Sequence, residues 1–160
     1  MKLFLFLILM IPFSSVRAQY LFKEKFSNCV TDLFGLEDKV IAHTNQYLFL
    51  KTIEDNIPPD TLKKLNGKIA FQILVDSVGT PCLLSLESYL NVHYQNLQFD
   101  KIINSKTQWT LDPDEKGKLV KVAALVILTF TEKDLIYQRI KITDFKKHKW
   151  EPIESYLRRK

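Results

Sequence analysis

The stretch NGKIAFQILVDSVG, at residues 66–79, constrains the fold of this chain more than any other part of its sequence. Large apolar side chains recur there at every second position, namely Ile69, Phe71, Ile73 and Val75. A period of two in a segment rich in β-branched and aromatic residues predicts a half-buried β-strand. Asp76 and Gly79 fit the first and the left-handed positions of a bulged type I turn, so we expect a β-hairpin.

Two further segments have the composition of strands. Residues 80–88 (TPCLLSLES) return as the second strand of the hairpin, and Pro81 lies at its start, where a proline removes no central ladder hydrogen bond. The apolar positions expected on one face of that strand are Cys82, Leu84 and Leu86. Residues 119–130 (LVKVAALVILTF) are the clearest strand of the chain.

This last strand is apolar on both faces, although an antiparallel sheet with one face in water should alternate apolar and polar residues. One face carries Val120, Val122, Ala124, Val126, Leu128 and Phe130, and the other carries Lys121, Ala123, Leu125, Ile127 and Thr129. Something must therefore cover the second face. The C-terminal tail, with residues 135–142 as an extra strand, is preferred over a partner protein as that cover.

Helical segments are predicted on both sides of the hairpin. Asn45 can cap a short helix that ends before Pro58, because proline cannot continue a helix. Asp60 can begin one further helical turn, which the Asn-Gly pair at residues 66–67 closes. Residues 94–109 (YQNLQFDKIINSKTQW) are the helix candidate between the second and the last strand.

The N-terminus has the pattern of a secretory signal peptide. Lys2 precedes an apolar run at residues 3–13, and Val16 and Ala18 fill the two small-residue positions of a cleavage site. The run is shorter than the ~20 residues of a membrane-spanning helix, which favours cleavage after Ala18 over an uncleaved anchor. We expect a periplasmic or secreted protein with a signal peptide (1–18), an N-terminal extension (19–44), one domain (45–130) and a basic C-terminal extension (131–160).

The chain has two cysteines, Cys29 and Cys82. In an oxidising compartment such a pair can close a disulfide, and two buried thiols that act as small apolar groups are the alternative. A role for either thiol as a nucleophile needs a histidine beside it in space, which the sequence does not show.

No catalytic residue, metal site or cofactor is predicted, and an enzyme is disfavoured. The three histidines are isolated in the sequence, so they do not form the paired pattern of a metal-binding face; they are His43, His93 and His148. The acidic group Asp112, Asp114 and Glu115 is interpreted as a solvated turn. Nucleophile-elbow and phosphate-loop patterns do not occur.

The formal net charge of +5 includes Lys2 and Arg17 of the signal peptide, so the mature chain carries about +3. This weak basicity does not predict a nucleic-acid partner. Two basic segments with aromatic residues lie in the tail, FKKHKW at residues 145–150 and YLRRK at residues 156–160. They indicate either contact with an anionic membrane surface or an acidic partner, or a solvated tail.

In their order, these features resemble the TonB C-terminal domain. The likeness spans about residues 46–130 and includes Gly67, Asp76, Gly79, Leu97, Trp109, Pro113 and Gly117. It implies an α+β fold in which a three-stranded antiparallel sheet packs on two helices, here with N- and C-terminal extensions. Two features depart from the family pattern, which usually has one residue between the Trp and the Pro and ends near the last strand. Here residues 110–112 lie between Trp109 and Pro113, and the chain continues from residue 131 to residue 160.

The resemblance also implies a function. TonB C-terminal domains bind a short segment of an outer-membrane transporter by adding it as a strand to a sheet edge. We therefore expect a protein-binding module of the cell envelope, whose partner is an outer-membrane transporter or another envelope protein. The residues expected at the binding edge are Val120, Lys121, Val122, Ala123 and Ala124.

Two considerations compete with that function. TonB's membrane anchor and Pro-rich spacer are not seen before the domain, so energy transduction is not expected. If residues 135–142 pair with the last strand, they take the place of a peptide there. The alternative is a structural or homodimeric envelope protein with no ligand, joined through the apolar second face of the sheet.

Overall fold

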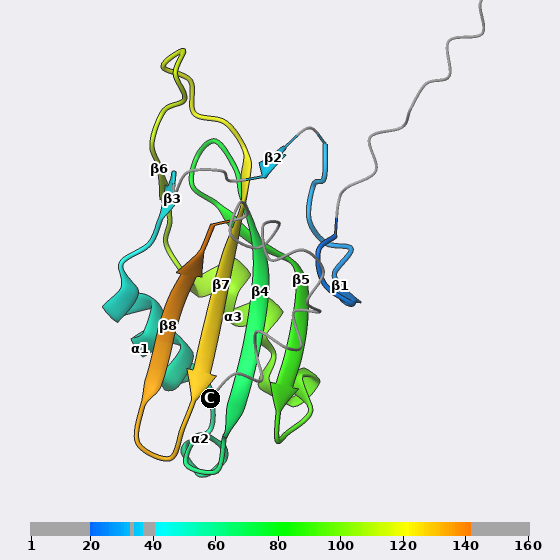
Figure 1. The fold of residues 1–160 in the computed structure, drawn as a ribbon, viewed down its shortest axis with the longest axis vertical. Helices are drawn as coiled ribbons and strands as arrows, with labels where there is room; N and C mark the ends of the chain where they lie inside the picture. Colours follow the sequence, from blue (N-terminus) through cyan, green and yellow to red (C-terminus); the bar gives the residue numbers. More distant parts are fainter. Residues whose placement is uncertain (1–19, 33, 37–40, 142–160) are drawn as a thin grey trace, which may run out of the picture.

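The computed structural model describes residues 20–32, 34–36 and 41–141 and shows a mixed α+β fold (Figure 1). The predicted signal peptide and the two basic segments of the tail lie outside these residues. Six strands of the described chain form one sheet. The predicted α+β class is confirmed, but the sheet is larger than the three strands that we expected.

The three predicted strands form the centre of this sheet, in the order β5-β4-β7 with antiparallel pairing. They are β4 (Gly67–Val75), β5 (Pro81–Leu90) and β7 (Val122–Phe130). The extensions supply the other three, which are β1 (Glu24–Lys25) beside β5, and β2 (Gly35–Leu36) and β8 (Leu135–Ile140) beside β7. The prediction of three strands was wrong because it counted only the strands of residues 45–130.

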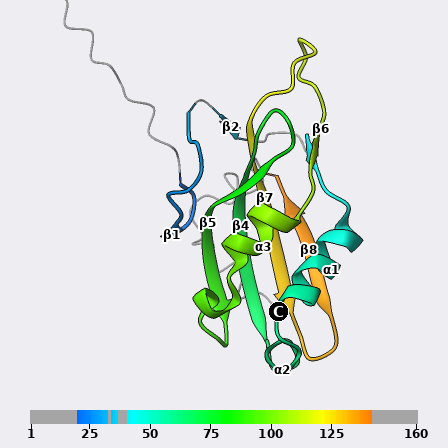
Figure 2. The same cartoon turned by 180° about the vertical axis from the view of Figure 1, so that it is seen from behind.

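Helices cover one face of the sheet, and Figure 2 shows α1 and α3 in front of it. The helical elements are α1 (Gln46–Asn56), α2 (Pro59–Leu62), the 3₁₀ turn η1 (Tyr94–Leu97) and α3 (Phe99–Lys106). The predicted cap of α1 is confirmed, since the Asn45 side chain accepts the N–H of Leu48 at 3.0 Å. α2 begins at Pro59 rather than at Asp60, because the fixed φ of proline suits the first helical position.

The main core lies between the helices and the sheet. The alternating residues of β4 that face it are fully buried; they are Ile69, Phe71, Ile73 and Val75. Phe49 of α1 and Phe99 of α3 pack against them, and the ring of Phe99 lies 5.0 Å from that of Phe71. A small second sheet of β3 (Ala42–His43) and β6 (Thr110–Leu111) lies beside the start of α1.

A β-bulge in the hairpin corrects the predicted faces of β5. Gln72 lies opposite Ser85 whereas Ile73 lies opposite Leu83, so Leu84 is an extra residue on β5. Leu84 therefore packs with Cys82 on the second face of the sheet, while Leu86 lies in the main core. The prediction that all three share one face was wrong, because the bulge shifts the alternation by one residue.

The second face of the sheet is covered mainly by the N-terminal extension. Phe22 packs on Ala70, Leu125 and Ile127, together with Ile140 of β8. A second cluster joins Leu74, Leu84 and Ala123 to Tyr20, Cys29, Phe34 and Cys82. Of the tail, β8 extends the sheet and Ile140 joins this cluster, while residues 142–160 lie outside the described residues, so the expected cover by the tail stays a prediction for that part.

A buried polar pair shows how closely the N-terminal segment fits. The Ser85 hydroxyl donates to Gln72 Oε1 at 2.6 Å, and both side chains are fully buried in the sheet. The N–H of Leu21 donates to Gln72 Oε1, and the N–H of Phe22 donates to Ser85 Oγ. The segment thus satisfies polar atoms that would be costly to leave unpaired.

No helix in the described part of the chain is long and apolar enough to cross a membrane.

Candidate protein-binding edge

The predicted binding residues lie at the start of β7 and just before it. The side chains of Val122, Ala123 and Ala124 are buried, and those of Val120 and Lys121 are half-buried. Their buried side chains belong to the core. A partner at this edge would therefore have to bind main-chain groups, as in strand addition.

Two segments of the same chain already lie along this edge of β7, because β4 pairs with its opposite edge. β8 runs antiparallel to it in six residue pairs, from Leu125 opposite Ile140 to Phe130 opposite Leu135. β2 runs parallel to it and places Gly35 opposite Val122 and Leu36 opposite Ala123. The tail thus pairs with the second half of β7, as the sequence allowed, but it leaves the predicted binding half to β2.

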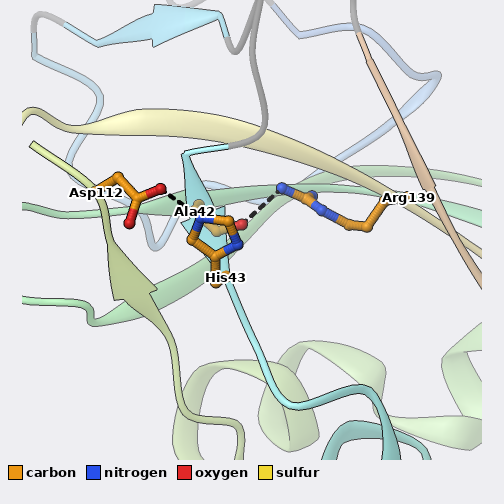
Figure 3. Close-up of polar contacts among 4 residues, drawn as sticks. All are labelled: Ala42, His43, Asp112 and Arg139. Carbon is orange, nitrogen blue, oxygen red and sulfur yellow. Dashed lines mark hydrogen bonds and ion pairs between the residues drawn. The ribbon is translucent and has the colours of Figure 1, made fainter. Parts of the chain in front are cut away.

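Side chains hold β8 in place. The Tyr137 ring lies 5.4 Å from the ring of Phe49, and Ile140 is only 8% exposed. Arg139 donates to the carbonyl oxygen of Ala42 at 2.9 Å (Figure 3). It also donates to the carbonyl oxygen of Leu125 at 3.2 Å. Its guanidinium also lies over the Trp109 ring, 5.4 Å from the ring centre. β8 is therefore an integral part of the fold.

Figure 3 also shows a contact beside the pairing of β3 with β6 in the small second sheet. His43 Nε2 lies 2.8 Å from Asp112 Oδ2, and the Asp112 N–H donates to the carbonyl of Ile41. The two side chains are 45% and 63% exposed, so the pair stabilises the fold only weakly. Asp114 closes the next turn by accepting the N–H groups of Lys116 and Lys118.

The described residues contain no group of three side chains that could hold a metal ion.

β2 makes far fewer contacts with β7 than β8 does. The Gly35 N–H donates to the Lys121 carbonyl at 3.0 Å, and the strand contains two residues. The Lys121 ammonium binds the carboxylate of Asp32 and, at 3.3 Å, the carbonyl of Val30. The segment before β2 is thus held to the sheet by an ion pair as well as by its backbone.

The two cysteines form a disulfide in the structure. The Sγ atoms of Cys29 and Cys82 lie 2.04 Å apart, and the bond joins the N-terminal extension to β5 across a sequence separation of 53 residues. Neither cysteine is a free thiol. The bond therefore serves as a tether for the segment that leads to β2, and neither sulfur is available as a thiolate nucleophile.

A groove of about 960 Å³ opens at the end of the sheet where the β4–β5 turn lies. It runs between the start of α1, that turn and the segment that follows α3. Leu48 and Val78 line it and are 52% and 83% exposed. Gly79 brings the turn close to this segment: its φ is +86°, and a Cβ there would lie 2.4 Å from the Trp109 carbonyl oxygen.

The sequence did not point to this groove or to β2. Leu48 and Val78 lie far apart in the chain, and the one available signal was an apolar valine in an otherwise polar turn. β2 carries no signal, because two residues show no alternation. Both features depend on contacts between distant segments.

Comparisons with known proteins do not assign the chain to a family. The chain has no significant match to a protein-family model, to a curated protein or to a solved structure. The likeness to the TonB C-terminal domain therefore rests on the residues alone.

Proposed function

We propose that the protein is a binding module of the cell envelope that takes an extended segment of a partner protein as a strand along residues 120–124. This proposal rests on the different pairing of the two halves of the β7 edge. β8 pairs with residues 125–130, whereas in the described chain only the two-residue β2 lies beside the preceding half. This short stretch of β7, beside the two-residue β2, is the acceptor edge that we propose for the partner strand.

The backbone geometry defines what this edge offers a partner. The Lys121 carbonyl faces the edge, because it accepts the N–H of Gly35. Backbone groups of successive residues point to opposite sides of a strand, so the N–H of Ala123 faces the edge too. The N–H groups of Val122 and Ala124 then face β4. Because the side chains here are buried, main-chain hydrogen bonds would dominate the affinity.

The resemblance to TonB C-terminal domains supports the same mode of binding. The central strands β5, β4 and β7 and the helices α1 and α3 occur in the chain order that this likeness implies. The partner proposed on this basis is an outer-membrane transporter or another envelope protein. Energy transduction is not part of the proposal. A periplasmic or secreted location is proposed from the signal-peptide pattern, with which the disulfide is compatible.

The homodimer alternative has lost its original motivation. It rested on an apolar second sheet face, and Phe22 and its neighbours cover that face within one chain. Light scattering of the mature protein at high concentration tests it directly. A stable dimer would revive this alternative.

In-cell crosslinking tests the proposed function. A photo-crosslinking residue in place of Leu119, which is 49% exposed beside this edge, should capture a defined envelope protein and leaves Lys121 intact. The same residue in place of Lys101, on the exposed side of α3, should not capture it. A synthetic peptide of the captured segment should then bind the purified protein. Adding N-methyl groups along that peptide, one at a time, should abolish binding only at alternate positions. Capture of the same proteins from both sites, or binding that ignores N-methylation, would reject strand addition at this edge.

A further inference from the structure

We propose that β2 is a self-donated strand that occupies the partner's place on β7 and is replaced by the partner. This inference rests on the proposed function, because it describes how the same edge is regulated. It also specifies the ligand: an extended segment that runs parallel to β7 and carries a carboxylate shortly before a small residue.

The first argument is that β8 and β2 make different numbers of stabilising contacts on this edge. Among the described residues, β8 has six residue pairs, the buried Ile140 and the hydrogen bonds of Arg139. β2 has two pairs and begins at an exposed glycine, and the apolar contact of its segment, Phe34, lies before the strand on the second face of the sheet. Regions with few buried contacts open locally far more often than the core does. β2 can therefore leave the edge while β8 and the sheet stay folded.

The second argument is the tether. The Cys29–Cys82 disulfide fixes the chain a few residues before β2, and the Asp32–Lys121 ion pair holds the segment between them. A short tether gives β2 an effective concentration on the order of millimolar at the edge. A partner must outcompete this local strand, so only a segment with additional contacts displaces it.

The third argument uses β2 as a template for the ligand. Asp32 lies three positions before Gly35 in the sequence, and its carboxylate reaches Lys121 at the edge. At Gly35, an added Cβ would lie 3.9 Å from Val122 Cγ1 and 4.0 Å from the Lys121 carbonyl oxygen, which is ordinary contact. A ligand with an acidic residue three positions before a glycine or an alanine therefore reproduces the contacts of the strand it replaces.

Hydrogen exchange of the intact, disulfide-bonded protein tests whether β2 opens. The Ala123 amide faces β2, and the amides of Val122 and Ala124 face β4, so the three neighbours provide an internal control. We expect the Ala123 amide to exchange at least ~10-fold faster than the other two amides. The reason is that β2, which protects Ala123, opens locally, whereas β4, which protects the other two, stays paired. Equal protection of all three amides would show that β2 is as firmly held as the core and would overturn the inference.

A matched pair of variants tests the replacement itself. Gly35→Pro removes the N–H that binds Lys121, and Gly35→Ala keeps it in a position where a methyl group fits. The probe is a synthetic peptide with the sequence of residues 31–38 (TDLFGLED). Gly35→Pro should bind the probe at least ~10-fold more tightly than the wild type and Gly35→Ala do, because its edge lacks the tethered competitor.

The same probe with Asn in place of Asp32 should bind the Gly35→Pro protein about twofold to fivefold more weakly, as expected for a partly exposed ion pair. Circular dichroism shows whether both variants are folded. Equal affinity of the two variants, or no binding to Gly35→Pro at millimolar probe, would overturn the inference. These experiments need no cellular partner, so fast exchange at Ala123 without any captured protein would reject the proposed function and leave the displaceable strand standing.

Discussion

β8 and β2 lie on the same edge of the same strand, yet they are held in different ways. β8 is fixed through Tyr137, Arg139 and Ile140, which reach the helical core, the small second sheet and the second face of the main sheet. In the described chain, β2 is fixed by a short backbone pairing and by contacts of the segment before it, which are the disulfide, the Asp32–Lys121 ion pair and the packing of Phe34. β8 is thus anchored by its own side chains, whereas the described anchors of the β2 segment lie before its two paired residues.

The comparison shows that backbone pairing alone does not decide whether a strand is permanent. Both segments use the hydrogen-bonding groups of β7, which are equivalent along its length. The buried side chain of Ile140 adds to the backbone pairing of β8, since burying a large apolar side chain stabilises by about 1.5–3 kcal/mol, whereas a typical hydrogen bond contributes about 0.5–1.5 kcal/mol. Four predictions follow this contrast from the largest expected effect to the smallest.

Removal of the tether should have the largest effect. The double change Cys29→Ser with Cys82→Ser should lower the free energy of unfolding by about 4 kcal/mol, because the disulfide closes a long loop in the unfolded chain. Urea denaturation measures the loss. The wild type under reducing conditions is the control and should lose the same amount. A loss below ~1 kcal/mol would show that the N-terminal segment is held mainly by its own contacts.

Truncation of the buried anchor of β8 should follow. Ile140→Ala should cost about 2–4 kcal/mol, because it leaves a cavity beside Phe22 and Leu125. Ile136→Ala on the same strand is the matched control, because Ile136 is 51% exposed, and it should cost less than ~0.5 kcal/mol. Thermal and urea unfolding compare the two. Equal losses would mean that β8 is not anchored through its buried face.

The arginine bridge should have an intermediate effect. Arg139→Ala should cost about 1–3 kcal/mol, since it removes two hydrogen bonds from a charged group and the contact with the Trp109 ring. Arg139→Lys should recover only part of this loss, because an ammonium cannot reproduce the planar fork of the guanidinium. Urea denaturation separates the three proteins. If Arg139→Lys had the same free energy of unfolding as the wild type, the positive charge alone would account for the stabilisation by Arg139.

Disruption of β2 should have the smallest effect on stability. Gly35→Pro should change the free energy of unfolding by less than ~1 kcal/mol, because it removes one hydrogen bond at an exposed position. Urea denaturation beside Gly35→Ala provides the measurement. A loss as large as that of Ile140→Ala would place β2 among the permanent strands and would remove the contrast on which the displaceable edge depends.

Much of the local structure was predictable because it depends on neighbouring residues. The Asn45 cap, the strand β4 and an extra strand within the predicted residues 135–142 follow from capping chemistry or from side-chain spacing, and the structure confirms them, with β8 at Leu135–Ile140. The prediction that β4 is half-buried was wrong, because both of its faces are covered from Ile69 to Val75. The hairpin turn forms where it was expected: Asp76 Oδ1 accepts the N–H groups of Val78 and Thr80.

The predicted faces of β5 show the limit of such local rules. The alternation of Cys82, Leu84 and Leu86 suggested one shared face, but a bulge at Leu84 divides them between two. The bulge depends on the pairing with β4 and is invisible in β5 alone. The edge of β7 shows the same limit, since residues 122–124 lie in β7 and residues 120–121 just before it, while their neighbour β2 gave no signal in the sequence.

The mixed α+β class, the three central strands, the capped helix and the turn were predictable without the structure. These features depend on periodicity and on hydrogen bonds between residues close in the chain. The tertiary structure alone decided that the N-terminal extension covers the second face, that Cys29 bonds to Cys82, and that β8 and β2 divide the edge of β7. A strand edge offers the same backbone groups to any segment, so only the long-range packing of side chains selects which segment lies there.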